Sequence, residues 1–575
     1  MKSSAKNMLD FRAAPLLNWL CFAPLTAVSL AFSSVAFAQA IAIPKSADIS
    51  RMRATPLEIP ESDYELRIRN AEKTALPKDV EELDFEVTKI QVTGANVFSE
   101  AMLFEVFGYL EGRTVKLSEV RAAAEILEDR YHEAGYLLTR VFVPPQMLEN
   151  GVLKVRVLEG YLENALFRAP NNSSKMAAQA AIQPLIGRRP LKVTELDTKM
   201  VLLNELPGLS AKSVLRPGDA LGSSRIVVSA DKRPNTFIIS SSNAGSDAIG
   251  PFSVTALASF NQPFGRIGAL DLTLTGAGED LGELKAFSSR YTFASGIAGI
   301  TASFGGLIAK AKPGGGAAAL GVVADSHSID ARLRRALYVS RPNSIYLDAG
   351  MVINSSKVSG LGSVLSDDQS SVAELTLSWR QSGLLGGEMI SSLSIFRGIK
   401  LFGAYGSDAR LPSVKGFEPK FTKWRLAINR RQPLAPKLSA AIKIQAQYTS
   451  DRLSSGEQIS FGGSAFGRGY DPSAATGDKG FGVLGEVKWD LGSLGMSGTV
   501  DRPELYAFGD WASAKTLAYE AEPAQVAKLA SLGFGFRAFL FRKLIADVQF
   551  ASGRKSDAFA IRRGDRVLFN SVLIF

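Results

Sequence analysis

The chain has 575 residues, a formal net charge of +10 at pH 7, and a composition that is 46% hydrophobic and 21% charged. The sequence has a single cysteine and two histidines, which nearly excludes zinc, haem and iron–sulfur sites built by the protein, because those sites need clustered imidazoles and thiolates. No GxSxG or HExxH motif is present, so neither an enzyme nor a cofactor is expected, and the dispersed basic residues argue against a nucleic-acid binder.

The first residues have the pattern of a secretory signal peptide. Basic residues at the start precede an apolar stretch over 13–30, and Ala36-Phe37-Ala38 fits a small-x-small cleavage site. Cleavage there would remove residues 1–38 together with Cys21, the only cysteine, so the exported chain would carry no disulfide. An uncleaved membrane anchor is the alternative, which the two prolines within the apolar stretch disfavour.

Residues 39–233 divide into a linker and a repeated α+β module. Residues 39–83 are polar and interrupted by prolines, and we expect a linker with one short plug helix over 62–73. From 84 on, the hydrophobic periodicity predicts a strand, two helices and two strands, in an order that occurs twice, at 84–160 and 161–233. These elements are expected at 85–92, 100–107, 118–135, 137–143 and 152–158 in the first copy, and at 162–168, 173–186, 194–206, 209–215 and 224–230 in the second.

Residues 234–575 show no helical periodicity, and short runs that alternate between apolar and polar residues take over. A soluble β-sandwich would give the same alternation and stays open as an alternative. An antiparallel transmembrane β-barrel is favoured, because the block is single and follows an export signal without disulfides or a helical anchor. Its last strand also has Phe569, Leu573 and the terminal Phe575 on one face. At roughly 20 residues for a strand with its connection, the block holds about 16 strands.

Two groups of residues resemble a known family. The first resembles the signature of the polypeptide-transport-associated (POTRA) domain of two-partner secretion transporters, and consists of Gly135-Tyr136, Pro144-Pro145-Gln146, Gly151 and Glu159-Gly160. The second is Gly467-Arg468-Gly469-Tyr470, which resembles the Val-Arg-Gly-Tyr loop of the wider Omp85 superfamily. Phe508-x-Asp510 is similar to the strand motif that accompanies this loop, although Gly467 stands where the family usually has valine and Ala512 where it usually has glycine.

The chain is therefore similar to ShlB/FhaC/HecB-type haemolysin secretion/activation proteins, the TpsB transporters of the Omp85 superfamily. That resemblance implies two periplasmic POTRA domains and a barrel in the outer membrane of a Gram-negative bacterium, which would capture an unfolded exoprotein and export it without ATP. No Walker-type phosphate loop is present, in agreement with a compartment that lacks ATP. The implied partners of this monomeric transporter are a TpsA-like exoprotein, outer-membrane lipid and the barrel-assembly machinery, for which Phe569, Leu573 and Phe575 would be the signal. A barrel-assembly insertase of the same superfamily and a solute porin stay open as alternatives.

The second motif suggests a site inside the barrel. The alternation over 504–511 places Asp510 on the side that would face the lumen. The long, glycine-rich loop over 462–480 holds Arg468, whose planar guanidinium could grip Asp510 through two N–H···O bonds if the loop folded inward. The resemblance implies that it does, and that this pore latch shapes the conducting state. Without the resemblance, a solvated extracellular loop with a surface arginine is favoured.

Overall fold

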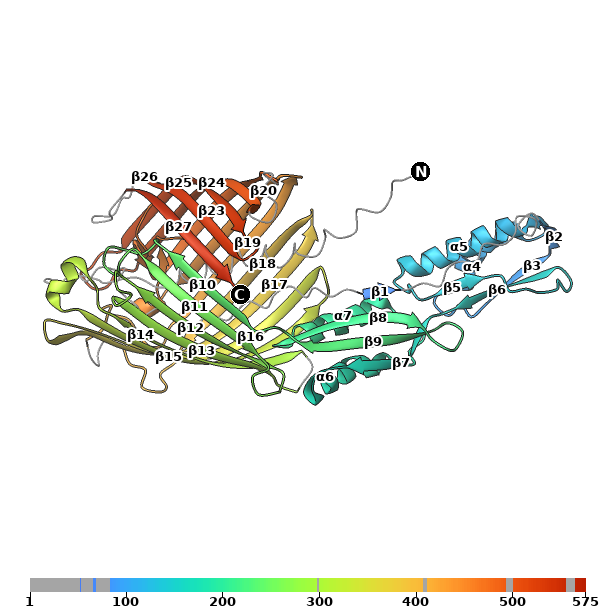
Figure 1. Cartoon of the computed structure of the whole chain (residues 1–575), viewed down its shortest axis with the longest axis horizontal. Coiled ribbons are helices and arrows are strands. Elements are labelled where there is room, and N and C mark those ends of the chain that lie inside the picture. The colour runs from blue at the N-terminus through green and yellow to red at the C-terminus, as the bar shows by residue number, and fades with distance from the viewer. Residues whose placement is uncertain are drawn as a thin grey trace. The chain divides into compact units, whose positions relative to one another are not determined.

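The computed structural model (Figure 1) describes residue 52 and residues 66–68, 83–296, 299–406, 411–492, 500–554 and 564–575. The chain forms two compact units, one of which spans Ser62–Arg233 together with the turn Phe264–Ile267, while the other holds the rest. The expected signal peptide lies outside the described residues. Within those residues, no helix is both long and apolar enough to cross a membrane.

The first α+β module contains a three-stranded sheet in the order β3-β6-β5, in which β3 is parallel and β5 antiparallel to β6. Helix α5 presents Val120, Leu127 and Tyr131 at helical spacing, and all three are fully buried, so this face of the helix forms the core. The elements are β2 (Asp84–Val87), β3 (Lys89–Thr93), α4 (Glu100–Phe107), η2 (Gly108–Leu110), β4 (Arg113–Lys116), α5 (Leu117–Glu133), β5 (Arg140–Phe142) and β6 (Val152–Leu158).

The second module repeats this arrangement. Strand β9 lies between β7, which is parallel to it, and β8, which is antiparallel, so each module places its last strand in the middle of the sheet. The β-α-α-β-β order is confirmed in both copies, although the strand expected over 85–92 is two short strands, because β2 leaves the sheet to pair with β4. The elements are β7 (Tyr161–Arg168), α6 (Asn172–Ile182), η3 (Gln183–Leu185), α7 (Val193–Asn204), β8 (Leu209–Pro217) and β9 (Ser223–Lys232).

One further strand extends the sheet of the second module. Strand β1 (Leu66–Ile68) pairs in parallel with β8, with Leu66 opposite Ser213. The plug helix expected over 62–73 is therefore wrong for these three residues, and the other residues of that segment lie outside the described ones. The sequence over 64–69 alternates apolar and charged residues, which suits a strand added to the edge that β8 offers.

Among the described residues of the second unit, sixteen antiparallel strands form a closed barrel, which confirms the expected architecture (Figure 1). The first and last strands close it, with Ile239 of β10 opposite Leu573 of β27. The strands are β10 (Thr236–Ser242), β11 (Ser253–Asn261), β12 (Gly268–Ala277), β13 (Leu284–Ala294), β14 (Ile300–Ala311), β15 (Val323–Val339), β16 (Asn343–Gly360), β17 (Ser363–Leu384), β18 (Gly387–Gly398), β19 (Thr422–Ala435), β20 (Leu438–Thr449), β23 (Lys479–Asp490), β24 (Val500–Thr516), β25 (Gln525–Leu540), β26 (Leu544–Arg554) and β27 (Asp565–Ile574), with η4 (Gly315–Leu320) in a loop.

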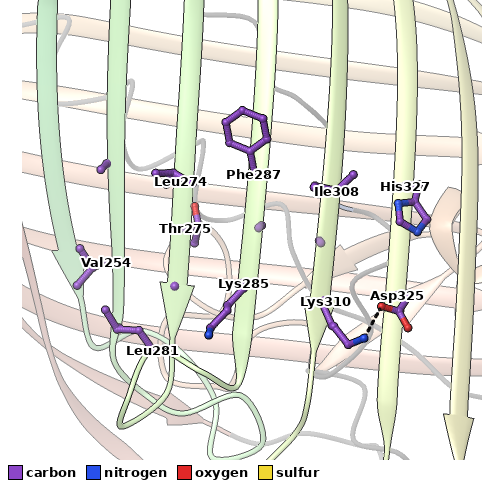
Figure 2. Close-up of a pocket in the computed structure, with 14 residues that line it drawn as sticks. Val254, Leu274, Thr275, Leu281, Lys285, Phe287, Ile308, Lys310, Asp325 and His327 are labelled. Carbon is purple, nitrogen blue, oxygen red and sulfur yellow. Dashed lines mark ion pairs between the residues drawn. The ribbon is translucent and has the colours of Figure 1, made fainter.

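The two faces of the barrel wall differ in polarity. On the outer face Trp379, Trp489 and Trp511 are between 40% and 57% exposed, whereas Arg290 and Asp330 on the inner face are buried and paired at 2.8 Å. A lipid-facing surface and a polar lumen require this alternation. A cavity of about 530 Å³ opens on the outer face at β11–β15, near the end of the barrel opposite to the one at which the chain enters β10 (Figure 2).

Candidate functional site

The loop between β20 and β23 folds back against the inner wall of the barrel. Within it, β21 (Ile459–Phe461) and β22 (Ala475–Gly477) form a short antiparallel pair, and the chain between them carries the Gly467-Arg468-Gly469-Tyr470 tip. Arg468 is only 7% exposed, and its neighbours are inward-facing side chains of β23, β24 and β26. The tip therefore lies inside the barrel rather than in a solvated loop outside it.

Two positions of the tip favour glycine, Gly469 because of a close backbone contact and Gly467 because of its backbone conformation. A Cβ at Gly469 would lie 2.3 Å from the backbone nitrogen of Gly553 in β26. Gly467 has a φ of +78°, a conformation that the valine usual at this position of the family rarely adopts. The close approach of two backbones thus depends on glycine on both sides of the contact.

Asp510 of β24 holds the main chain of the tip. Its carboxylate accepts the backbone N–H of Gly467 at 2.7 Å and that of Arg468 at 3.4 Å. It also accepts the hydroxyl of Ser531 at 2.8 Å, and the same hydroxyl receives the backbone N–H of Gly469 at 3.2 Å. One carboxylate therefore fixes three consecutive peptide groups, two directly and one through Ser531.

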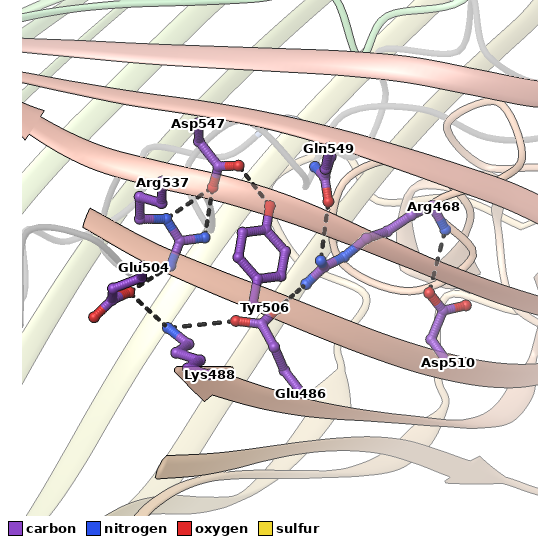
Figure 3. A network of polar contacts seen from close by, with 9 residues as sticks. All are labelled: Arg468, Glu486, Lys488, Glu504, Tyr506, Asp510, Arg537, Asp547 and Gln549. Carbon is purple, nitrogen blue, oxygen red and sulfur yellow. Dashed lines mark hydrogen bonds and ion pairs between the residues drawn. The ribbon is translucent and has the colours of Figure 1, made fainter. Parts of the chain in front are cut away.

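The guanidinium of Arg468 binds elsewhere (Figure 3). It donates to Glu486 at 3.0 Å and to Gln549 at 3.0 Å, and lies 4.1 Å from the ring centroid of Phe508. The expected grip of this guanidinium on Asp510 is therefore wrong. The backbone of Arg468 already rests on Asp510, so its long side chain extends away along the wall and reaches the next carboxylate instead.

Tyr470 adds further hydrogen bonds between the tip and the barrel wall. Its side chain is fully buried, and its hydroxyl donates to the carbonyl of Arg554 at 2.5 Å. Its own carbonyl accepts from Arg566 at 2.6 Å, and Arg566 also donates to the carbonyl of Gly245 at 2.8 Å. Through these bonds the tip is joined to the last strand of the barrel and to the loop that follows the first.

A chain of ion pairs continues from Glu486 along the wall (Figure 3). Basic and acidic side chains alternate in it, and none is more than 21% exposed, so removal of one member would leave a buried partner, at a cost of about 3–5 kcal/mol. The contacts are Glu486–Lys488 at 3.3 Å, Lys488–Glu504 at 4.0 Å, Glu504–Arg537 at 3.8 Å and Arg537–Asp547 at 2.5 Å, with the Tyr506 hydroxyl 2.5 Å from Asp547.

Sequence reasoning did not name these residues as part of the site. The signal was nevertheless present, since Glu486 and Lys488 alternate with the outward Val487 and Trp489, which are 47% and 57% exposed. Charged residues at successive inward positions of one strand need partners from neighbouring strands or from a loop inside the barrel. The pattern thus indicated a charged inner wall, but not which group would pair with Arg468.

The base of the loop is also bonded to the inner wall. Lys423 of β19 and Glu457 form an ion pair at 2.6 Å, and their side chains are 1% and 0% exposed. Gln447 of β20 donates to the carbonyls of Glu457 at 3.1 Å and Asp478 at 2.9 Å. The loop is therefore bonded to the wall at its base, on β19 and β20, and at its tip, on β23–β26.

In the first module, the Pro144-Pro145-Gln146 block ends the pairing of β5 with β6. Continued in register, Pro144 would face Lys154, but proline has no N–H to donate. The side chain of Gln146 replaces the missing strand, because it accepts the N–H of Lys154 at 2.9 Å and donates to its carbonyl at 2.7 Å. Gly151 immediately precedes β6 with a φ of +72°.

Glu159 of the same signature ties a loop to helix α5. Its carboxylate accepts the backbone N–H groups of Asn96 at 2.7 Å and Val97 at 3.1 Å, and the hydroxyl of Tyr131 at 3.0 Å. Burial, and then the carboxylate of Glu159, raise the pKa of Tyr131 well above its usual range, so its hydroxyl remains a donor.

The remaining residues of this signature lie where the two modules meet. The carbonyl of Gly135 accepts the N–H of Val193 at 3.0 Å, and that of Gly160 accepts the N–H of Leu191 at 3.0 Å. The ammonium of the lysine before Val193 lies 5.2 Å from the ring centroid of Tyr136. These contacts give the signature a structural role in joining the modules.

At the other end of the chain, Phe569 and Leu573 lie on β27, on the face opposite to the buried Leu568 and Val572. The N–H of Phe575 donates to the carbonyl of Phe237 at 2.9 Å, and its side chain is exposed. The three residues expected to form the assembly signal thus line the outer face at the seam of the barrel. Their recognition by other proteins stays a prediction.

Comparison with known proteins places this architecture among outer-membrane transporters. The model of the family described as haemolysin secretion/activation protein ShlB/FhaC/HecB matches residues 222–538, and the model of the ShlB-type POTRA domain matches residues 85–160.

Two curated proteins are similar over most of their length. The outer membrane transporter CdiB of Escherichia coli O6:K15:H31 (strain 536) is 24% identical over 440 residues, which cover 72% of this chain and 71% of that protein. The heme/hemopexin transporter protein HuxB of Haemophilus influenzae (strain 86-028NP) is 25% identical over 540 residues, 89% and 91% of the two chains. The solved structure of CdiB from Escherichia coli superimposes with a TM-score of 0.64 and 18% identity, covering 88% of this chain and 93% of that one, which shows a common fold.

Proposed function

Because this chain belongs to the ShlB/FhaC/HecB family of haemolysin secretion/activation proteins, we propose that it exports one partner exoprotein through its barrel. The family, which the sequence motifs identified, consists of outer-membrane transporters of the two-partner secretion type, with periplasmic POTRA domains. In this proposal the partner arrives unfolded, export uses no ATP, and folding of the partner outside the cell draws it forward.

The partner binds first to the free edge of β7. In the sheet order β1-β8-β9-β7, the two edge strands are β1, which has three residues, and β7, which has eight and offers the longer edge. Among the described residues, one bridge, between Leu162 and Ile186, lies on the outer side of β7, and in this proposal the partner strand pairs with the rest of that edge. Strand addition uses backbone hydrogen bonds more than particular side chains, which suits an unfolded substrate.

The observation that carries the proposal is the loop tip seated on a charged wall inside the barrel. Its bonds are hydrogen bonds and ion pairs that mostly involve a charged group, and such bonds contribute about 1.5–3 kcal/mol each. Water or a passing polypeptide can supply replacement partners for them. The loop can therefore leave its seat while the wall keeps its strand pairing. A solute porin needs neither this loop nor two periplasmic modules.

Deletion of the gene tests the proposal. One large exoprotein, encoded beside this gene, should disappear from the culture medium and return when the gene is restored on a plasmid. General loss of outer-membrane proteins would point to an assembly insertase instead. An unchanged set of exported proteins with altered uptake of small solutes would point to a porin.

A further inference from the structure

The cavity on the outer face of the barrel lies at a defined level of the wall (Figure 2). Lys285 is the second residue of β13, Lys310 the second to last of β14, and Asp325 the third of β15. All three therefore lie at the end of the barrel opposite to the one at which the chain enters β10. Because the POTRA modules that precede β10 are periplasmic, the end with these three residues faces the outside of the cell. The cavity opens where the lipid-facing band meets the outer surface.

Two like charges meet at the rim of this cavity. Lys285 and Lys310 are directly opposite each other in the antiparallel register of β13 and β14, an arrangement that destabilises a sheet unless the charge is compensated. Asp325 compensates part of it, since its carboxylate lies 3.3 Å from the ammonium of Lys310. Lys285 makes no ion pair with any residue that the structure describes, so the rim keeps one net positive charge.

Below the rim the cavity is apolar. Leu274, Phe287 and Ile308 follow one another across β12, β13 and β14, and they are 59%, 37% and 54% exposed. Gly276 is opposite both Val254 of β11 and Lys285, and Leu281 packs over it, since a Cβ at Gly276 would lie 2.9 Å from the Cβ of Leu281. A positive rim therefore stands directly above a hollow with apolar walls.

We propose that this cavity binds a phosphorylated, acylated lipid of the outer leaflet. A phosphate sits between Lys285 and Lys310, where it relieves their repulsion through charge-assisted hydrogen bonds. An acyl chain lies along Leu274, Phe287 and Ile308. Basic pockets above apolar surfaces are known to bind anionic lipid head groups, and lysine on the lipid face costs little near the membrane interface.

A lipid titration of the purified full-length protein tests the proposal. Native mass spectrometry in detergent with added lipid A, which carries both phosphates and acyl chains, gives the apparent Kd. The double variant Lys285→Gln, Lys310→Gln should bind at least tenfold more weakly. The control is Lys479→Gln, Lys515→Gln, a second directly opposed lysine pair of the outer wall that does not line this cavity, and it should stay within twofold.

The two halves of the ligand can be separated. Lipid A without phosphates should bind the native protein as weakly as intact lipid A binds the double variant, and Phe287→Ala, Ile308→Ala should weaken binding of intact lipid A. Retention of native affinity by the Lys285 and Lys310 variant would overturn the proposal, as would equal losses at both lysine pairs, which would indicate general attraction of anions. Heat-modifiable migration reports barrel closure for each variant, and Lys285→Met alone repeats the test if the double variant does not fold.

Discussion

The carboxylate of Asp510 accepts the backbone N–H of Gly467 at 2.7 Å and so holds the inward loop by its main chain. The guanidinium of Arg468 consequently remains available for Glu486, at 3.0 Å, and for Gln549. The seat of the loop thus depends on two separate carboxylates, one for the backbone and one for the side chain. Substitutions can separate their contributions.

Asp510→Ala should loosen the tip while the ion pair between Arg468 and Glu486 stays in place. It removes the acceptor of two backbone N–H groups and of the Ser531 hydroxyl, and a hydrogen bond to a charged group contributes about 1.5–3 kcal/mol. With Cys21 replaced by serine, a cysteine at position 465 should react at least tenfold faster with a water-soluble maleimide. The control is Asp271→Ala, which removes an inward carboxylate of β12 that accepts a hydrogen bond from Ser259 of β11, and it should leave the labelling rate unchanged.

Charge reversal at Arg468 should identify its partner. Arg468→Glu places two carboxylates beside each other in a buried site, and breaking such a pair costs about 3–5 kcal/mol, enough to shift the loop out of its seat. The second change Glu486→Arg should restore both export and the native single-channel conductance in planar bilayers. Asp510→Arg combined with Arg468→Glu should restore neither, because Asp510 binds the backbone; rescue by that combination would contradict the pairing described here.

Gly469→Ala should displace the tip by steric contact alone. The added Cβ would come within 2.3 Å of the backbone of Gly553, and a backbone of a paired strand has little freedom to move. We expect unstable channel conductance with normal barrel assembly. Gly485→Ala on β23 is a matched control, since its Cβ would meet no atom within 4 Å; if both variants behave alike, close packing at Gly469 does not hold the loop.

The sequence predicts those features of the site that depend on neighbouring residues, and not those that depend on residues far apart in the chain. The period-two alternation in β24 places Asp510 on the inner wall, because the face of a strand residue follows from its own neighbours. The partner of Arg468 does not follow in this way. It depends on how the tip lies across four strands, and two carboxylates of that wall, Glu486 and Asp510, are close enough to compete for it.

The same reasoning applies to the periplasmic modules. Helix α4 occupies the residues expected for it, 100–107, because an amphipathic helix is specified by its own sequence. Strands β1 and β4 have three and four residues, and they exist because β8 and β2 offer them an edge. Short stretches of this kind carry too few positions for periodicity to distinguish a strand from a helix.

Glu159→Ala should destabilise the first module specifically. It removes the acceptor of the Asn96 and Val97 N–H groups and leaves the buried Tyr131 hydroxyl without its charged partner, for which we expect a loss of about 1.5–3 kcal/mol for each bond to the charge. Hydrogen exchange of the full-length protein, followed by mass spectrometry, should show at least tenfold faster exchange in peptides from 84–160 and native rates in the barrel. Glu133→Ala, at the end of α5, should leave those rates unchanged. Equal protection in the Glu159 variant would show that the hydrophobic core holds this loop without the carboxylate.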